Sequence, residues 1–469
     1  MKTIKHIIWM AAIALTAATW TACSNDDEPT TAEQPAQPRI YTVTTTLSSR
    51  NGATTRSTMT DNGDGSISAE WQVGDKIFVR YTNTSDAPVN TTAEVIAVNP
   101  SSKAATITVT LTNPKGGEFI TFGYPLSRYN GSGTLDPATD QIGTLADINA
   151  NYAGIQGYGI LTVDGSNVTL PAVTMSPDMC IWKFSFTDGT SDITNDITKL
   201  IIDFPNDNPY YAVTYTVTPL SQSTIYVAMY GDVINAEPIC ITALTASGFY
   251  RKSAASVTLA AGRTYTTTGF ALKKAEVNKV FGVDGNIYDN VAAANAASTA
   301  LAKIAYVGND AETNTTYNHG LALALTDANS GNKATWCSQE DDNCLGSQYE
   351  NETAAKGDMA GIANTDALVG HTTHTHAAAN AARNYNSGTH PTGTSAWFLP
   401  SAGQWDKMIN AAGGYSTLRT NAGLQSSNYW SSTESGSFFA WSYYFGNGCW
   451  NLGNFKDQSS YYVRAALAF

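Results

Sequence analysis

The C-terminal stretch from Asn428 to Phe469 has the sequence NYWSSTESGSFFAWSYYFGNGCWNLGNFKDQSSYYVRAALAF. Many of its positions hold residues typical of buried strands and of the polar groups that fasten them, and we expect these to form a fixed frame. The frame comprises Tyr429, Trp430, Ser431, Ser432, Thr433, Glu434, Ala440, Trp441, Phe445, Gly448, Lys456, Val463, Arg464, Leu467, Ala468 and Phe469. Aromatic side chains bury large areas, so Trp430 and Trp441 are predicted to be core anchors.

The positions set between these residues form what we call the insert. It comprises Ser435, Ser437, Phe438, Phe439, Ser442, Tyr443, Tyr444, Asn447, Cys449, Asn451, Leu452, Asn454, Phe455 and Asp457. Each of these types can be written by replacing adenines in an Asn codon while the third base is kept. A Trp codon cannot be produced from an Asn codon in this way, so Trp450 either belongs to the frame or derives from a codon other than Asn.

The insert has the chemistry of a binding face. Tyr and Phe provide rigid contact area, and Ser and Asn provide adaptable hydrogen bonds. The alternative is an aromatic core, but a core would leave many of these polar groups unpaired. We therefore expect the insert to lie on one exposed surface, and Tyr443 and Tyr444 to contribute most to binding.

The order of motifs in this part of the chain resembles a known domain family. FLPS at 398–401 and QW at 404–405 precede YWSSTE at 429–434 and YVRA at 462–465. This order resembles the C-type-lectin-like domains of variable proteins diversified by diversity-generating retroelements and, more distantly, the formylglycine-generating-enzyme branch of that fold. The resemblance implies an α+β ligand-binding domain over residues 279–469 with a variable region at 428–469.

Local signals predict several elements of this domain. Asp284-Gly285 indicates a hairpin turn, and the Ala-rich stretch 291–303 favours a helix followed by a strand at 304–308. Leu321–Leu325 is a second strand candidate. Ser401 followed by Gln404 predicts a capping box at the start of a helix.

Residues 40–272 have a different sequence pattern, in which apolar and polar residues alternate, as in YTVTTTL at 41–47 and ATITVTL at 105–111. Such runs between turn signals are typical of β-sandwiches. EWQVGDKIFV (70–79), FGYP (122–125), VTM (173–175), IWKF (181–184) and AGRTY (261–265) resemble the fimbrillin-like surface lipoproteins. That resemblance implies two β-sandwich lobes, at 40–165 and 166–272, and a role as a pilus subunit or surface stalk.

The first residues predict export. Lys2 and Lys5 precede an apolar run and the small-residue approach to Cys23, which is the pattern of a secretory signal at 1–22. Cys23 resembles the acylated cysteine of a bacterial lipoprotein, although Trp20 departs from the usual small aliphatic residue, and ordinary cleavage nearby is the alternative. The acidic run at 24–28 resembles a surface-export signal, and residues 23–39 have the composition of a solvated tether. We therefore expect a lipid-anchored protein on the outer-membrane surface.

Composition narrows the function further. A net charge of -13 with only 14% charged residues and no basic block argues against nucleic acid and anionic lipid as partners. His371, His374 and His376 lack a neighbouring carboxylate or thiol at metal-site spacing, and the acidic loop Glu340-Asp341-Asp342 is expected to be solvated rather than to bind calcium. No metal or other cofactor is predicted. Cys337 and Cys344 bracket a short loop, and the sequence leaves both a disulfide and two thiols open.

Two functions remain. The first is a non-enzymatic surface adhesin that presents the diversified face to a protein or glycan on another cell or phage. The second is a structural or tip subunit of a fimbrillin-type pilus without a diversified site, with other pilus subunits as partners. An enzyme of the formylglycine-generating type would need a reactive cysteine pair near the C-terminus, where only Cys449 lies.

Overall fold

The structure is a computed structural model of the 469-residue chain. It describes residues 38–49, 58–62, 67–126, 140–152, 154–177, 179–204, 213–230, 236–314, 316–339, 343–391 and 393–469. The signal segment, Cys23 and the acidic loop 340–342 lie outside these residues. Contacts join Ile40–Phe469 into one unit. Among the described residues, no helix is both long and apolar enough to cross a membrane.

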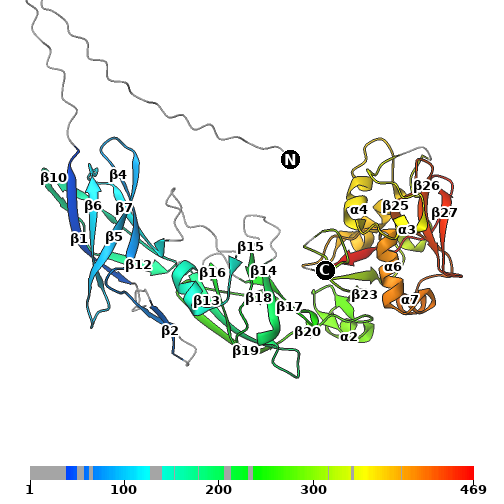
Figure 1. The fold of residues 1–469 in the computed structure, drawn as a ribbon, viewed down its shortest axis with the longest axis horizontal. Coiled ribbons are helices and arrows are strands. Elements are labelled where there is room, and N and C mark those ends of the chain that lie inside the picture. Colours follow the sequence, from blue (N-terminus) through cyan, green and yellow to red (C-terminus); the bar gives the residue numbers. More distant parts are fainter. Residues whose placement is uncertain are drawn as a thin grey trace, which may run out of the picture. The chain divides into compact units, whose positions relative to one another are not determined.

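The first part of the chain forms a closed barrel (Figure 1). Its strands are β1 (Ile40–Ser49), β4 (Lys76–Thr82), β5 (Pro88–Val98), β6 (Ala105–Thr112), β7 (Phe119–Tyr124), β9 (Ile155–Ile160) and β12 (Val173–Pro177), in the order β1-β12-β9-β7-β4-β5-β6. Buried and more exposed positions alternate along β6, so its aliphatic residues enter the core while its threonines face outward. Two hairpins accompany the barrel, β2 (Thr58–Asp61) with β3 (Ile67–Glu70) and β10 (Thr162–Asp164) with β11 (Asn167–Thr169).

The next part contains two sheets with a shared apolar core. The smaller has the order β16 (Ile225–Tyr230), β13 (Met179–Thr187), β19 (Thr264–Ala271). The larger has the order β20 (Lys273–Lys274), β18 (Gly248–Val257), β17 (Glu237–Thr245), β14 (Ile197–Phe204), β15 (Val213–Val217), β8 (Asp140–Gln141). Short turns of helix lie at α1 (Leu145–Asp147), η3 (Ile148–Tyr152) and η4 (Thr194–Asp196).

The mainly β prediction for the N-terminal region is confirmed, but its details need two corrections. The first lobe is a closed barrel because β1 and β12 pair in parallel, whereas the sequence predicts a β-sandwich. The predicted boundary at Gly165 is wrong. Gly165 lies in the turn between β10 and β11, β12 returns to the barrel after it, and β8 pairs with β15 of the second lobe before it. Alternation reports which side of a strand is buried and does not identify its partner.

The C-terminal region has two sheets and six α-helices among its described residues. The five-stranded sheet has the order β22 (Ile287–Tyr288), β21 (Val280–Gly282), β23 (Ala300–Val307), β24 (Gly320–Ala324), β28 (Ala466–Ala468). The three-stranded sheet has the order β25 (Asn428–Glu434), β26 (Phe439–Tyr444), β27 (Cys449–Phe455). The helices are α2 (Val291–Ala297), α3 (Glu352–Ala355), α4 (Gly361–Val369), α5 (Ala377–Arg383), α6 (Ala402–Ala411) and α7 (Tyr415–Ala422), with the 3-10 turns η5 (Asn329–Gly331) and η6 (Tyr385–Gly388). The region is α+β.

In this region the predictions of a turn and of a helix cap are confirmed, whereas the predicted extent of one helix is wrong. Gly285 has φ +80° in the turn between β21 and β22, as the hairpin prediction requires. Ser401 and Gln404 form the predicted capping box at the start of α6. The predicted helix at 291–303 is too long, because α2 ends at Ala297 and β23 begins at Ala300 between β21 and β24. Strand pairing overrides the helix propensity of alanine there.

Candidate ligand-binding face

The three-stranded sheet rests on a buried frame. Trp430 is fully buried, and its Nε1 donates to the Ala334 carbonyl at 2.8 Å. Trp441 is 2% exposed and donates to the Tyr349 carbonyl at 2.8 Å. The prediction that both tryptophans are buried is confirmed. The other frame positions are also buried, except that Gly448 is half-buried.

A buried ion pair joins β25 to the residue that follows β27. The Lys456 ammonium donates to the Glu434 carboxylate, and neither side chain is exposed. Backbone amides of Cys344 and Leu345 also donate to Glu434, at 3.3 and 3.2 Å. Burial raises the pKa of Glu434, while Lys456 opposes the rise. The pair therefore fixes the end of β27 against the frame.

The insert residues do not all share one environment. Phe438, Asn447, Cys449, Leu452 and Phe455 are exposed, and Ser437, Phe439, Tyr444, Asn451, Asn454 and Asp457 are half-buried. Ser435, Ser442 and Tyr443 are buried, at 8%, 0% and 4% exposure.

The expectation that Tyr443 lies on the surface is therefore wrong. It packs with Trp405 and Met408 of α6, and its ring lies 4.8 Å from Phe445 and 4.9 Å from Trp450 between centroids. This burial raises the pKa of Tyr443 to about 12. β26 is the central strand of its sheet, so the helix that covers one face buries the side chains pointing to that face.

The expectation that Ser435 and Ser442 lie on the surface is also wrong, because both side chains are buried. Ser442 accepts a hydrogen bond from the Asn454 amide at 3.0 Å, and Asn451 donates to Asn428 at 2.8 Å. Tyr461 in turn donates to Asn454 Oδ1 at 2.7 Å. These polar insert residues are bonded to neighbouring side chains, so the aromatic insert residues are the main candidates for a contact surface.

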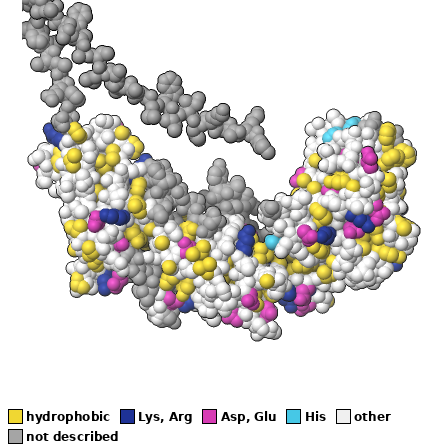
Figure 2. Space-filling model, viewed as in Figure 1, with side chains coloured by type: hydrophobic (Ala, Val, Ile, Leu, Met, Phe, Trp, Pro, Cys, Tyr) yellow, Lys and Arg dark blue, Asp and Glu magenta, His cyan; other side chains and the backbone are white. Residues whose placement is uncertain are grey.

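Three aromatic residues form what we call the Phe438 patch: Phe438, Phe439 and Phe455. Phe438 is 44% and Phe455 40% exposed. The ring of Phe439 lies 6.2 Å from that of Phe438 and 4.9 Å from that of Phe455 between centroids. Leu452 on β27 is 53% exposed. Hydrophobic side chains gather on the surface over β26 and β27 (Figure 2).

Cysteine and histidine side chains lie close together beside α5. The possible disulfide does not join Cys337 to Cys344 in the structure, and Cys344 Sγ lies 3.3 Å from His376 Nε2. The rings of His371 and His376 are 5.2 Å apart between centroids. In the part of the chain that the structure describes, no group of three or more His, Cys, Asp or Glu side chains is placed to hold a metal ion.

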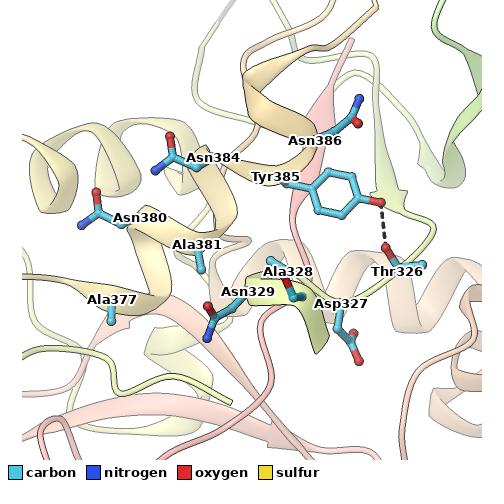
Figure 3. A pocket seen from close by; sticks show the side chains of 11 residues that line it. Thr326, Asp327, Ala328, Asn329, Ala377, Asn380, Ala381, Asn384, Tyr385 and Asn386 are labelled. Carbon is cyan, nitrogen blue, oxygen red and sulfur yellow. Dashed lines mark hydrogen bonds between the residues drawn. The ribbon is translucent and has the colours of Figure 1, made fainter. Parts of the chain in front are cut away.

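The structure adds a groove that sequence analysis did not identify. It lies between the Thr326–Ser330 segment and the α5–η6 segment (Figure 3). The only sequence signal is the density of asparagine in NAARNYN at 380–386. Residues from two distant segments form the groove, so neither segment reveals it alone.

No protein-family model matches the chain. No curated protein matches it either.

Among solved structures, a fimbrial protein from Bacteroides ovatus aligns with 91% of this chain and 99% of its own, at 13% identity and a TM-score of 0.33. A candidate cell adhesion protein from Bacteroides uniformis aligns over 48% of this chain and 92% of its own, at 13% identity and a TM-score of 0.28. The adhesin InvE from Yersinia pseudotuberculosis aligns over 91% and 97%, at 12% identity and a TM-score of 0.18. These neighbours are fimbrial and adhesion proteins, but TM-scores this low establish no shared fold.

Proposed function

We propose that this chain is a surface-displayed adhesin in which a fimbrillin-like β region carries a C-type-lectin-like domain. In this proposal, the β25–β27 sheet presents a sequence-diversified face to a protein on another cell or phage. In this proposal the chain is not an enzyme. An enzyme of the formylglycine-generating type would need a reactive cysteine pair near the C-terminus, where Cys449 is the one cysteine.

The observation that carries the proposal is the exposure of the Phe438 patch above a frame whose side chains are buried. Phe438 and Phe455 leave large apolar areas in water, an arrangement that marks interaction sites when the residues are contiguous. The frame beneath is held by buried aromatic residues and by the Lys456–Glu434 pair. A rigid support lowers the entropy that binding has to offset.

The chemistry of the patch favours a protein ligand. Aromatic residues are enriched and charged residues depleted at the centres of protein interfaces. The fourteen insert positions include one ionisable carboxylate, Asp457, and neither lysine nor arginine. Tyr444 is half-buried and takes the place of Tyr443 as the tyrosine available for contact.

The alternative is a structural pilus subunit. A subunit that polymerises by strand donation needs an uncommitted strand, whereas β28 pairs with β24 and Phe469 is 1% exposed. The Phe469 amide and carbonyl also bond to Gly320 and His319. β28 is therefore committed within the C-terminal region and is not available as a donor strand.

We expect the double variant Phe438→Ser/Phe455→Ser to lose binding of the purified protein to target cells by at least about tenfold, because a few aromatic anchors carry most of an interface's affinity. Its thermal unfolding should change little, since exposed substitutions usually shift stability within about 0.5 kcal/mol. Flow cytometry with labelled protein measures the binding.

The matched control is Phe119→Ser/Tyr158→Ser on β7 and β9. These two aromatic residues are 61% and 71% exposed, and their rings lie 6.0 Å apart between centroids. Equal losses in both double variants would mean that general surface hydrophobicity, rather than the β25–β27 face, mediates attachment.

Lipid anchoring through Cys23 is part of the proposal. Growth with a labelled fatty acid should mark the wild-type protein and leave Cys23→Ala unmarked, because the thioether and amide acylation sites are both lost with that cysteine. Labelled protein is detected after gel separation. Equal labelling of the two proteins would refute the anchor and leave the binding face untouched.

A further inference from the structure

The groove between the Thr326–Ser330 segment and the α5–η6 segment has the size of a ligand site. Its volume is about 670 Å³, within the range of roughly 300 to 1,000 Å³ typical of small-molecule pockets. Figure 3 shows Tyr385 reaching across it, and the Tyr385 hydroxyl lies 3.0 Å from Thr326 Oγ1. Ala328, Ala377 and Ala381 add small apolar surfaces between the polar groups.

The groove carries no uncompensated charge on its lining residues. Asp327 is its one carboxylate, and both oxygens are used: Oδ1 accepts from Arg464 Nε at 2.8 Å and Oδ2 from the Tyr429 hydroxyl at 3.1 Å. Among the described residues that line the groove there is no lysine, arginine or histidine. Phosphate, sulfate and carboxylate ligands would need such cations, and calcium would need several uncommitted oxygen ligands.

The remaining polar groups are mainly asparagine amides, several of which donate hydrogen bonds to nearby backbone carbonyls. The amide nitrogen of Asn380 donates to the His376 carbonyl at 2.9 Å, and that of Asn329 to the Lys333 carbonyl at 3.3 Å. Their Oδ1 atoms are thereby left to accept. Among the described residues, none hydrogen-bonds to the exposed side chain of Asn384, which offers both a donor and an acceptor.

Both rims of the groove have a strained backbone. Asn329 and Ser330 each have φ +54° on one rim, and Asn386 and Ser387 have φ +50° and +54° on the other. Consecutive non-glycine residues in this left-handed region are uncommon and cost energy, and such strain gathers at ligand sites. Here it fixes the positions of the Asn329 and Asn386 amides.

We propose that this groove binds a neutral saccharide without calcium. Sugar hydroxyls both donate and accept, which matches oriented amides, and the apolar face of a sugar ring packs against an aromatic ring and methyl groups. The groove shares no residue with the insert, so this binding is independent of the proposed function of the β25–β27 face.

The test uses the full chain on an array of neutral oligosaccharides built from glucose, galactose, mannose and N-acetylglucosamine. Sialylated and sulfated oligosaccharides and unstructured peptides are printed beside them, and EDTA is present. The strongest neutral oligosaccharide is then titrated in solution by fluorescence anisotropy. We expect binding to neutral oligosaccharides, and a loss of at least about tenfold in the triple variant Asn329→Gly/Asn384→Ala/Asn386→Gly, which removes several hydrogen bonds.

This triple variant is expected to fold like the wild type, because glycine accepts positive φ without strain at the two rim positions. Its thermal midpoint should match or exceed that of the wild type. Asn278→Gly is the matched control, an exposed asparagine with φ +76° outside the groove, and it should bind normally. Phe438→Ser/Phe455→Ser should also bind the saccharide normally.

Several results would overturn the saccharide site: no binding to any neutral oligosaccharide, binding only to anionic ones or to peptides, a need for calcium, or wild-type affinity in the triple variant. If the wild type bound the saccharide and only Phe438→Ser/Phe455→Ser lost that binding, the site would lie on the β25–β27 face and the assignment to the groove would be wrong.

Discussion

Trp430→Ala is expected to lower the free energy of unfolding by about 3 to 5 kcal/mol, the usual cost of removing a large aromatic side chain from a core. Trp430 is fully buried, its ring centroid lies 4.6 Å from that of Tyr461, and its indole N–H bonds to the Ala334 carbonyl. The change would open a cavity and remove one of the two hydrogen bonds that the Ala334 carbonyl accepts, the other coming from the Tyr461 amide at 3.1 Å. Urea unfolding followed by the remaining tryptophan fluorescence measures the loss.

Tyr158→Ala is the control, since Tyr158 is 71% exposed on β9 and its replacement should shift stability by no more than about 0.5 kcal/mol. A Trp430→Ala variant as stable as this control would mean that the aromatic frame under β25 does not hold the C-terminal region together.

Lys456→Met is expected to cost a similar amount, about 3 to 5 kcal/mol near pH 7, because it leaves Glu434 buried without its cation. Met preserves most of the length of the side chain, so packing changes little. Both charged groups are fully buried, and two backbone amides remain to hold the carboxylate. Urea unfolding again measures the change.

The loss should depend on pH in a defined direction. Burial raises the pKa of Glu434 above its ordinary value of 4.5, and Lys456 opposes that rise. A folded-state pKa above the unfolded value means that protonated Glu434 favours the folded state. This contribution to the free energy of unfolding is complete below pH 4.5 and is lost as the pH rises through the folded-state pKa. Without Lys456 the pKa rises further, and Lys456→Met should be closer to wild type at about pH 5 than at about pH 8.

The double variant Glu434→Gln/Lys456→Met removes both charges and should recover more than half of the lost stability, as replacement of a whole buried pair usually does. A single variant whose deficit is the same at both pH values would show that Glu434 is not the group left uncompensated.

The sequence predicts local structure well where a side chain acts on its own neighbourhood. The Ser401–Gln404 capping box, the Gly285 turn and the burial of Trp430 follow from the chemistry of single residues and are confirmed. The helix at 291–303 fails because pairing of β23 with two other strands outweighs local propensity.

Long-range arrangement accounts for the remaining differences. The Gly165 boundary fails because β12 pairs back to β1 and β8 pairs forward to β15. Tyr443 is misplaced because its residue type suits a binding face, whereas its position on a central strand under α6 buries it. The groove was missed because Asn329 and Asn384 are neighbours only in the folded chain.

We propose above all that the C-terminal region separates a fixed frame from an exposed, diversified face. Deep sequencing of the last coding stretch across many isolates tests it most directly. Substitutions should concentrate at exposed or half-buried insert positions such as Phe438, Asn451 and Phe455, and should spare Trp430, Glu434 and Lys456. The DNA nearby should hold a near-copy of this coding stretch beside a reverse transcriptase gene. The coding stretch should differ from that near-copy only where the near-copy has adenines. Substitutions spread evenly over frame and insert, without that near-copy, would contradict the claim.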